Sequence, residues 1–248
     1  MSPDPLILDH YREHGYVKLP GFLPAAELKT VEAEIQRLAD RGPSAFDKGH
    51  FYLAQDERTI QQIEHLQAYS SYFADMMKSD RRVLDIVEAI FGAAAVGNNV
   101  SYMAKPARVG EVVPYHQDNA YYGYLPPDAL SVWIALDESN ERNGCLRVVP
   151  GSHKDGLRRH GPTGVRGISY GLADPVDPQP DGEVAIVLRR GDASVHHCCT
   201  FHSSHPNLSE RSRRGLILFY HCERCRIDQS VLDDYALARE RMIAEAGE

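Results

Sequence analysis

The chain lacks a long hydrophobic run. No stretch approaches the roughly 18–20 apolar residues that a transmembrane helix needs, and the first residues show no basic segment followed by a long apolar one. The sequence therefore predicts neither a membrane partner nor a secretory signal. Cysteine is scarce as well, with five residues in a chain of 248. An odd count fits reduced thiols better than a disulfide framework, so we expect a cytoplasmic protein.

Positively charged residues are also fewer than negatively charged ones. Lysine and arginine number 27 against 35 aspartates and glutamates, which gives a net charge of −8. An acidic surface argues against nucleic acid or an anionic membrane as the main partner. With 248 residues, 43% of them hydrophobic, the chain has the size and apolar content of a single domain over residues 1–248.

What the sequence does contain is a change of pattern near residue 95. Residues 23–40 and 80–92 carry apolar side chains at steps of three and four, which predicts two amphipathic helices. From about 95, short β-like runs such as "LSVWIAL" alternate with turn residues. The pattern predicts an α+β, mainly β fold. Its core would be a double-stranded β-helix (a cupin-like jelly roll) over about 95–225, after a helical part over about 1–92 and before a C-terminal helical tail.

Two candidate metal ligands stand in "YHQDNAYY", where one residue separates His116 from Asp118. On a β-strand, residues i and i+2 project from the same face, so both side chains can reach one ion. A second histidine would complete the facial triad of non-haem Fe(II) oxygenases, which leaves coordination positions open for reactants. The segment "SVHHCCTFHSSHPNLS" offers four histidines for this role, and His202 directly follows an apolar run.

The joint pattern resembles the phytanoyl-CoA dioxygenase family of Fe(II)/2-oxoglutarate-dependent oxygenases. The segments that carry the resemblance are "YHQDNAYY", "LSVWIALDESNERNGCLRVVPGSH", the "GD" at 191–192 and "HSSHPNLSERSRR", in this order. The resemblance implies His116, Asp118 and His202 as iron ligands, with Fe(II), the cosubstrate 2-oxoglutarate and O₂ taking part. It further implies hydroxylation of an aliphatic C–H bond of a small metabolite, with release of succinate and CO₂.

The same resemblance places the cosubstrate. Arg213, eleven residues past His202, would pair with the far carboxylate of 2-oxoglutarate through its planar fork of donors. Ser204 would help to hold that carboxylate, and Trp133 would form an aromatic wall of the pocket. These three residues are expected to define the cosubstrate end of the site.

At three further positions, comparison with the family pattern bears on cosubstrate binding or on the type of reaction. Ser101 stands where the family often has a methionine against the cosubstrate. Gln62 stands where some relatives have a lysine, and an amide there can hydrogen-bond a carboxylate but gives up the charge. Related halogenases replace the aspartate of the triad with a small residue, so the presence of Asp118 favours hydroxylation over halogenation.

The substrate-binding part of the predicted active site is the part that the sequence defines least. We expect it to be lined by Tyr102, Asn119, Tyr121, Tyr122, Arg158 and His197. The tyrosines fit equally well as β-formers at a barrel rim, and a structural role for His197 is an equal alternative. Arg158, together with Arg147, Arg159 and His160, would suit an anionic metabolite, unless these charges belong to a solvated loop.

Other interpretations stay open at this stage. The "HHCC" of residues 196–199 and the Cys222–Cys225 pair offer a structural zinc site, although adjacent cysteines on a strand point to opposite faces. The protein can also be a non-catalytic jelly-roll binding protein that keeps a metal for structure, or a zinc-dependent hydrolase. A cosubstrate anchor such as Arg213 argues against the first, and the lack of an evident general base argues against the second. A monomer and a homodimer are both open.

Overall fold

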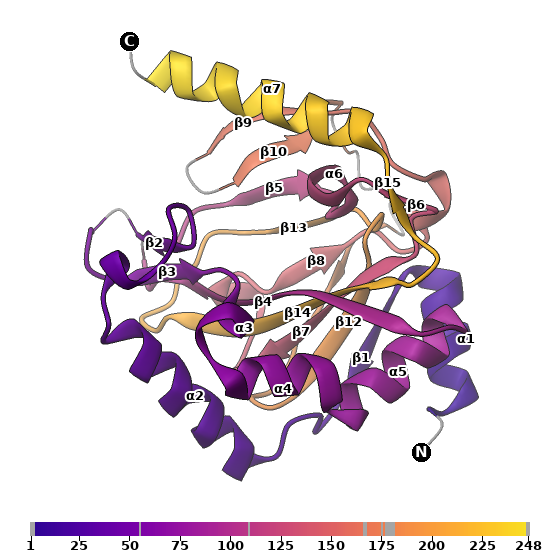
Figure 1. Cartoon of the computed structure of the whole chain (residues 1–248), viewed down its shortest axis with the longest axis horizontal. Coiled ribbons are helices and arrows are strands. Elements are labelled where there is room, and N and C mark those ends of the chain that lie inside the picture. Colours follow the sequence, from indigo (N-terminus) through magenta and orange to yellow (C-terminus); the bar gives the residue numbers. More distant parts are fainter. Residues whose placement is uncertain are drawn as a thin grey trace.

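The N-terminal helices lie along one side of a large β-sheet (Figure 1). A computed structural model describes residues 3–54, 56–108, 110–165, 168–174, 176 and 182–246. Its helices are α1 (Pro5–His14), α2 (Ala25–Ala39), α3 (Leu66–Tyr69), α4 (Ser71–Ser79), α5 (Arg81–Phe91), α6 (Asn119–Tyr122) and α7 (Gln229–Ala246). Its strands are β1 (Tyr16–Leu19), β2 (Phe51–Leu53), β3 (Ile60–Ile63), β4 (Ala95–Lys105), β5 (Val113–His116), β6 (Tyr124–Leu125), β7 (Ala129–Ala135), β8 (Leu146–Val148), β9 (His160–Val165), β10 (Ile168–Leu172), β11 (Val184–Ala185), β12 (Ala193–His197), β13 (His202–Ser204), β14 (Arg213–Cys222) and β15 (Arg226–Ile227).

Two antiparallel sheets form the body of the domain. The larger has the strand order β1-β12-β7-β14-β4-β3-β2, and the smaller has the order β11-β8-β13-β5. Trp133 and Ala135 of the larger sheet pack with Val148 of the smaller one, so apolar side chains fill the space between the sheets. This arrangement confirms the predicted α+β class with a double-stranded β-helix core.

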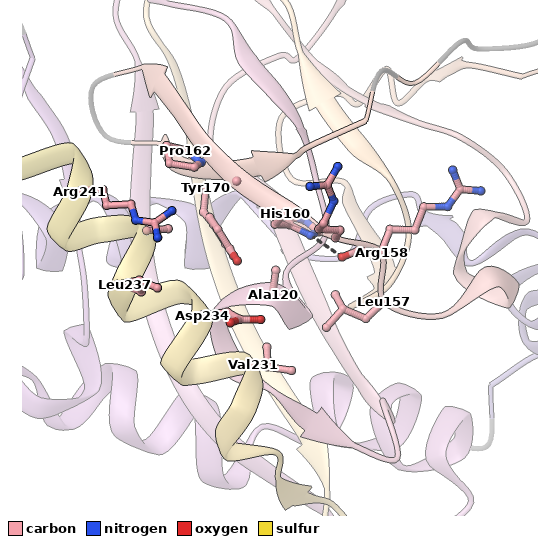
Figure 2. A pocket seen from close by; sticks show the side chains of 13 residues that line it. Ala120, Leu157, Arg158, His160, Pro162, Tyr170, Val231, Asp234, Leu237 and Arg241 are labelled. Carbon is pink, nitrogen blue, oxygen red and sulfur yellow. Dashed lines mark hydrogen bonds between the residues drawn. The ribbon is translucent and has the colours of Figure 1, made fainter. Parts of the chain in front are cut away.

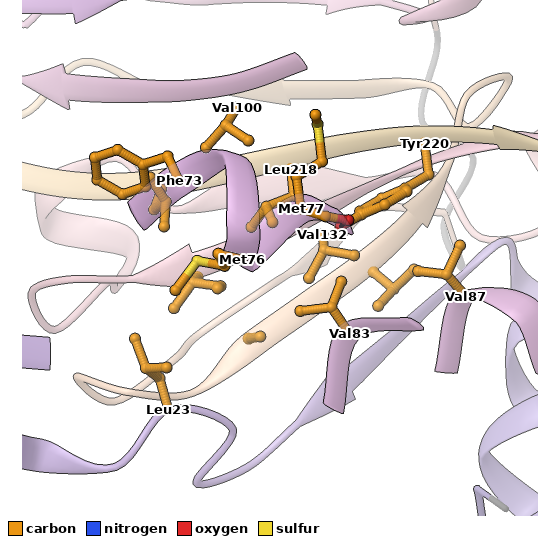
Figure 3. Close-up of a cluster of buried hydrophobic side chains, with 14 of the residues drawn as sticks. Leu23, Phe73, Met76, Met77, Val83, Val87, Val100, Val132, Leu218 and Tyr220 are labelled. Carbon is orange, nitrogen blue, oxygen red and sulfur yellow. Dashed lines mark hydrogen bonds between the residues drawn. The ribbon is translucent and has the colours of Figure 1, made fainter. Parts of the chain in front are cut away.

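Side chains of the central strands alternate between two faces of the larger sheet. Leu218 and Tyr220 of β14 are fully buried against Met77 of α4 and Val83 of α5, as Figure 3 shows. Each fully buried side chain of this size contributes about 1.5–3 kcal/mol to folding. Ile217 of β14 points to the opposite face, where it packs against the cluster that includes Trp133 and Val148. Because the helices supply most of the apolar packing on one face, the opposite face can carry polar groups.

The helix predicted over residues 80–92 is α5, and its end residues are its caps. The side chain of Asp80 accepts a hydrogen bond from the backbone N–H of Arg82 and so caps the start of α5. Gly92 ends the helix in the left-handed conformation, with φ of 61°. Among the described helices, none combines the length and the apolarity that crossing a bilayer requires.

Candidate active site

His116, Asp118 and His202 come together at the ends of two paired strands. His116 ends β5 and His202 begins β13, and the two residues are direct partners in the antiparallel register. Oδ1 of Asp118 lies 3.8 Å from Nε2 of His116 and 3.3 Å from Nε2 of His202. The three candidate ligand atoms all lie within 4.8 Å of one another, a spacing that fits a single metal ion.

Both imidazoles are held in the tautomer that a metal ligand needs. Nδ1 of His116 lies 3.0 Å from the carbonyl oxygen of Pro114, and Nδ1 of His202 lies 2.9 Å from that of Thr200. A carbonyl oxygen only accepts hydrogen bonds, so each Nδ1 carries a proton and Nε2 is the nitrogen left to bind a metal. Burial and then the neighbouring His202 lower the pKa of His116 to about 3. Two imidazole nitrogens and one carboxylate oxygen are a donor set that suits Fe(II).

Asp118 does not lie on the strand, as the i, i+2 argument assumed. β5 ends at His116, and Asp118 has helical backbone angles (φ −57°, ψ −35°) where α6 begins. Its Oδ2 atom accepts a hydrogen bond of 2.6 Å from Ser131 Oγ and lies 3.2 Å from Nε2 of His196. Burial opposes ionisation, but His202 and His196 hold the pKa of Asp118 well below its usual range. With Oδ2 occupied, Oδ1 is the oxygen that remains for a metal.

Gln117, between the two candidate ligands, is fully buried and fastens the turn. Its Nε2 donates to two backbone carbonyls, each at 2.7 Å. Its Oε1 accepts a bond of 2.8 Å from the backbone N–H of Arg158, and its own backbone N–H donates to Nε2 of His160 at 3.0 Å. The positions of His116 and Asp118 are therefore set by the protein in advance of any metal.

Arg213 starts β14 on the sheet face that also carries Trp133. It is only 6% exposed, and its guanidinium carbon lies 5.2 Å from the centre of the Trp133 ring. Within the described residues, Arg213 Nε has no hydrogen-bond partner. Burial lowers the pKa of Arg213 to about 10. A buried guanidinium with an unsatisfied donor is costly, so the arrangement fits an anionic ligand such as a carboxylate.

Ser204 and Lys105 lie at the same end of the site. Lys105 is the register partner of Arg213, and its Nζ donates to Ser204 Oγ at 2.7 Å. Both side chains are 5% exposed. Burial and then Arg213 lower the pKa of Lys105 to about 7. Sequence reasoning did not select Lys105, because its only signal is a lysine at the end of a strand whose pairing with Arg213 the sequence does not reveal.

Ser101 and Gln62 belong to the same face by register. Ser101 pairs with Ile217, which in turn pairs with Trp133 on the other side of β14. Gln62 pairs with Met103, two residues further along β4. The amide of Gln62 already donates to Glu64. A contact between Gln62 and the cosubstrate stays a prediction.

Tyr121 and Tyr122 stand beside the candidate metal ligands. The ring of Tyr121 meets that of His116 edge-on, with centroids 6.0 Å apart, and its hydroxyl donates to the carbonyl oxygen of Tyr170. Tyr122 stacks on Phe219 at 4.0 Å, and Phe219 is the register partner of Ser131. Both tyrosines thus lie near the candidate metal ligands, and their contact with a substrate stays a prediction.

The structure does not bring Tyr102 and Asn119 to this group. Tyr102 follows Ser101 on β4, so it points to the opposite face and packs into the helix-side core. The side-chain amide of Asn119 accepts a hydrogen bond of 2.9 Å from the backbone N–H of Tyr124 and donates one of 3.0 Å to the carbonyl oxygen of the same residue. We therefore correct both expectations: each side chain has a structural role.

His196, and not His197, is the histidine beside Asp118. The two are neighbours on β12 and point to opposite faces. Nδ1 of His197 accepts a bond of 3.0 Å from the backbone N–H of Cys199, and its ring lies 5.2 Å from that of His153. The sequence contains the adjacent pair, but only the register of β12 against β7 tells which of the two faces the site.

The alternative zinc site is incomplete. His197, Cys198 and Cys199 place one ligand atom each within 4.8 Å of one another, but Cys222 and Cys225 do not join them. Cys225 Sγ donates to the backbone carbonyl of Pro126 instead. Structural zinc takes four ligands, and the described residues offer three.

A cavity of about 280 Å³ lies between α7, the β9–β10 hairpin and α6 (Figure 2). Its charged lining residues are Arg158, Arg159, Arg241 and Asp234, and none of the three candidate metal ligands lines it. Arg158 pairs with Asp155 at 3.0 Å, and Arg159 pairs with Asp174 at 3.1 Å. These two arginines, which suggested an anionic substrate, are therefore already balanced by carboxylates.

The fold and the site together define a class of enzyme. A jelly roll that holds a buried His–Asp–His group and, on the facing sheet, a buried arginine with a free donor is typical of oxygenases that use a metal and a 2-oxo acid. A family model described as phytanoyl-CoA dioxygenase (PhyH) matches residues 11–215. The chain belongs to this family and is a 2-oxoglutarate-dependent dioxygenase of the PhyH type, which decides against the binding-protein and zinc-hydrolase alternatives.

Individual relatives agree with this assignment. A probable alpha-ketoglutarate-dependent hypophosphite dioxygenase of Stutzerimonas stutzeri is 26% identical over 223 residues, which cover 85% of this chain and 76% of the relative. The fold is similar to that of EctD from S. alaskensis with 2-oxoglutarate and 5-hydroxyectoine (TM-score 0.76, 21% identity, 91% and 78% of the two chains). It is also similar to that of the epimerase SnoN with Fe³⁺, alpha-ketoglutarate and nogalamycin RO (TM-score 0.72, 22% identity, 90% and 87%).

Proposed function

We propose that the chain hydroxylates an aliphatic C–H bond of a small metabolite at the expense of 2-oxoglutarate and O₂. One oxygen atom of O₂ enters the alcohol product, the other enters succinate, and the 2-oxo acid loses CO₂. The observation that carries the proposal is the convergence of His116, Asp118 and His202 within 4.8 Å. The SnoN structure contains Fe³⁺ and alpha-ketoglutarate, and the EctD structure contains 2-oxoglutarate, which supports the same cofactors here.

His116, Asp118 and His202 would hold Fe(II), which when bound supplies the power to activate O₂ for cleavage of a C–H bond. The chain engages each Nδ1 with a backbone carbonyl and so leaves each Nε2 as the nitrogen that would bind the metal. Ser131 and His196 hold Oδ2 of Asp118, so this carboxylate offers one oxygen to the metal. The protein thus supplies one face of ligands and leaves the rest of the coordination sphere to the reactants.

Arg213 would bind the far carboxylate of 2-oxoglutarate through two parallel hydrogen bonds. The Trp133 ring packs against the guanidinium at 5.2 Å and limits its orientation. Ser204 lies two residues after His202 on β13, so the strand that carries a candidate metal ligand also carries a residue of the cosubstrate end. Trp133 and Val148 belong to the apolar cluster between the sheets, which keeps bulk water away from the anchor.

The substrate is a small molecule in this proposal, and Tyr121, which lies beside His116, and Tyr122, which stacks on Phe219, would contact it. The paired state of Arg158 and Arg159 gives no support for an anionic substrate. Hydroxylation is preferred over halogenation because Asp118 retains the carboxylate. A cytoplasmic location fits the five cysteines, all of which are free thiols.

A succinate-release screen over candidate metabolites tests the proposal. The expected result is a low background of 2-oxoglutarate turnover that rises with one class of metabolite and yields an alcohol with one added oxygen atom. The product's mass and the incorporation of label from ¹⁸O₂ distinguish hydroxylation from desaturation or ring closure. An absence of succinate with every metabolite, from protein shown to bind Fe(II) and 2-oxoglutarate, would contradict the proposed turnover.

A further inference from the structure

Lys105 is a buried lysine without a carboxylate to pair with. It ends β4, it is 5% exposed, and no ion pair of the described residues includes it. Its Nζ donates to Ser204 Oγ at 2.7 Å, to the carbonyl oxygen of His205 at 2.6 Å and, more weakly, to that of Ser204 at 3.3 Å. All its partners therefore belong to two consecutive residues that directly follow His202 and Ser203.

The chain encloses the stem of Lys105 so tightly that the end of the side chain has little freedom. A Cβ atom built on Gly110 would lie 2.3 Å from Cγ of Lys105, and one built on Gly144 would lie 2.9 Å from Cδ. Either contact would force the stem or the backbone to move. Asn207 also fastens the lysine, because its Nδ2 donates to the Lys105 carbonyl oxygen at 2.8 Å. The ammonium group of Lys105 is therefore held at a defined position beside Ser204.

The direction of the Lys105–Ser204 hydrogen bond decides what the serine can do. In its ammonium form Lys105 has donors only, so Ser204 Oγ must then act as the acceptor in this pair. The O–H of Ser204 is then left to donate elsewhere. Ser204 lies on the same strand as His202, and its partner Lys105 pairs in register with Arg213, so the serine connects the candidate metal ligand to the anchor through these neighbours.

We propose that Lys105 is a positioning residue for 2-oxoglutarate, which orients the Ser204 hydroxyl so that it donates to the carboxylate bound by Arg213. The inference rests on the proposed function, since it assumes that the cosubstrate binds at Arg213. A lysine that only fastened the loop would affect stability but not the strength of cosubstrate binding through Ser204. The two roles differ in a measurable way.

The test is a binding titration that needs no turnover. N-Oxalylglycine, an unreactive analogue of 2-oxoglutarate, is titrated calorimetrically into wild type, Lys105→Met, Ser204→Ala and the double variant, each loaded with Mn(II). Loss of one hydrogen bond to a charged group weakens binding by about tenfold or more, so each single variant is expected to show this loss. If Lys105 acts through Ser204, the lysine substitution adds less than about twofold in the Ser204→Ala background.

The controls separate this inference from the proposed function. Lys154→Met makes the same substitution at an exposed lysine that pairs with Glu13, and it should bind the analogue like wild type. Failure of wild type to bind the analogue at all would overturn the proposed function. Normal binding by wild type, with unchanged binding by Lys105→Met or with losses that multiply in the double variant, would overturn the role of Lys105 alone.

A second variant keeps the test decisive if Lys105→Met does not fold. Lys105→Gln keeps a polar side chain at this position but is shorter and cannot place an ammonium beside the Ser204 hydroxyl. It should show the same weakening of N-oxalylglycine binding while Mn(II) affinity stays within about twofold of wild type, because His116, Asp118 and His202 are untouched. Wild-type affinity for the analogue in Lys105→Gln would contradict the proposal.

Discussion

His116 and His202 face each other across the pairing of β5 with β13, and the centroids of their rings are 4.0 Å apart. The same local device orients both rings: each Nδ1 donates to the carbonyl group two residues earlier in the chain. The strand pairing sets the distance between the rings, and the backbone sets the tautomer of each. Together they turn both Nε2 atoms toward Asp118, so that one metal ion could be bound by all three residues.

His202→Ala is expected to abolish metal binding and, with it, succinate formation. The substitution removes one of three ligands, and the other two cannot hold the ion at micromolar concentrations. Metal content after gel filtration and a succinate assay measure the effect. His197→Ala is the matched control, because this histidine faces the opposite side of β12; it should retain the metal. Retention of metal by His202→Ala, or loss of metal from His197→Ala alone, would show that the wrong histidine has been assigned.

Arg213→Ala should raise the 2-oxoglutarate concentration required for activity while leaving the metal site intact. Truncating one partner of a buried charged pair costs on the order of 2–5 kcal/mol, a loss of at least about thirtyfold in affinity. The neighbouring Arg214 points to the other face and pairs with Asp137 at 2.7 Å and with Glu32 at 2.8 Å. Arg214→Ala should therefore lower the melting temperature with little change in cosubstrate affinity. The opposite pattern would mean that Arg214 is the anchor.

Ser131→Ala should weaken metal binding about 10–100-fold, the range typical of hydrogen-bond partners behind a ligand. The hydroxyl donates to Oδ2 of Asp118, and without it the carboxylate is free to rotate or to bind the ion through both oxygens. Ser139→Ala is a suitable comparison, since its buried hydroxyl has no partner among the described residues. Metal competition with a chromophoric chelator reports both affinities, and identical values in the two variants would rule out the positioning role of Ser131.

Gly215→Ala should disturb the cosubstrate end without touching a charged residue. A Cβ atom at this position would lie 2.4 Å from the Trp133 ring, so the ring has to move from its place against Arg213. We expect a higher KM for 2-oxoglutarate with unchanged metal affinity. At Gly161 the same substitution meets only Ala173, at 3.8 Å, and should be silent. Steady-state kinetics measure the KM of both variants for 2-oxoglutarate. A rise in Gly215→Ala alone supports the local effect on Trp133, and an equal rise in both variants contradicts it.

Much of the fold could be predicted because its signals are local. The helices around Leu28 and Val83 show clear apolar periodicity, and β7 and β14 are runs of β-forming residues. By contrast, α4 and the β9–β10 hairpin are short and depend on packing against α5 and α7 for their stability. No periodic pattern of sufficient length marks such elements in the sequence.

For the site, the family motif predicts which residues converge, but not which way their neighbours point. His116, Asp118 and His202 lie together as that motif implies. The choice between His196 and His197, and between Ser101 and Tyr102, depends on strand register, where a shift of one residue exchanges the two faces. Lys105 was missed for the same reason, because its partner Ser204 lies 99 residues further along the chain.

The most direct test of the site is anaerobic titration of the Fe(II)-loaded protein with 2-oxoglutarate, followed by visible absorption spectroscopy. If His116, Asp118 and His202 hold the iron and Arg213 anchors the cosubstrate, wild type binds one iron per chain and develops a weak charge-transfer band that saturates with 2-oxoglutarate. The band should be absent from His202→Ala and require far more 2-oxoglutarate in Arg213→Ala. A folded wild-type protein that binds no iron, or that binds iron but never develops the band, would contradict the assignment.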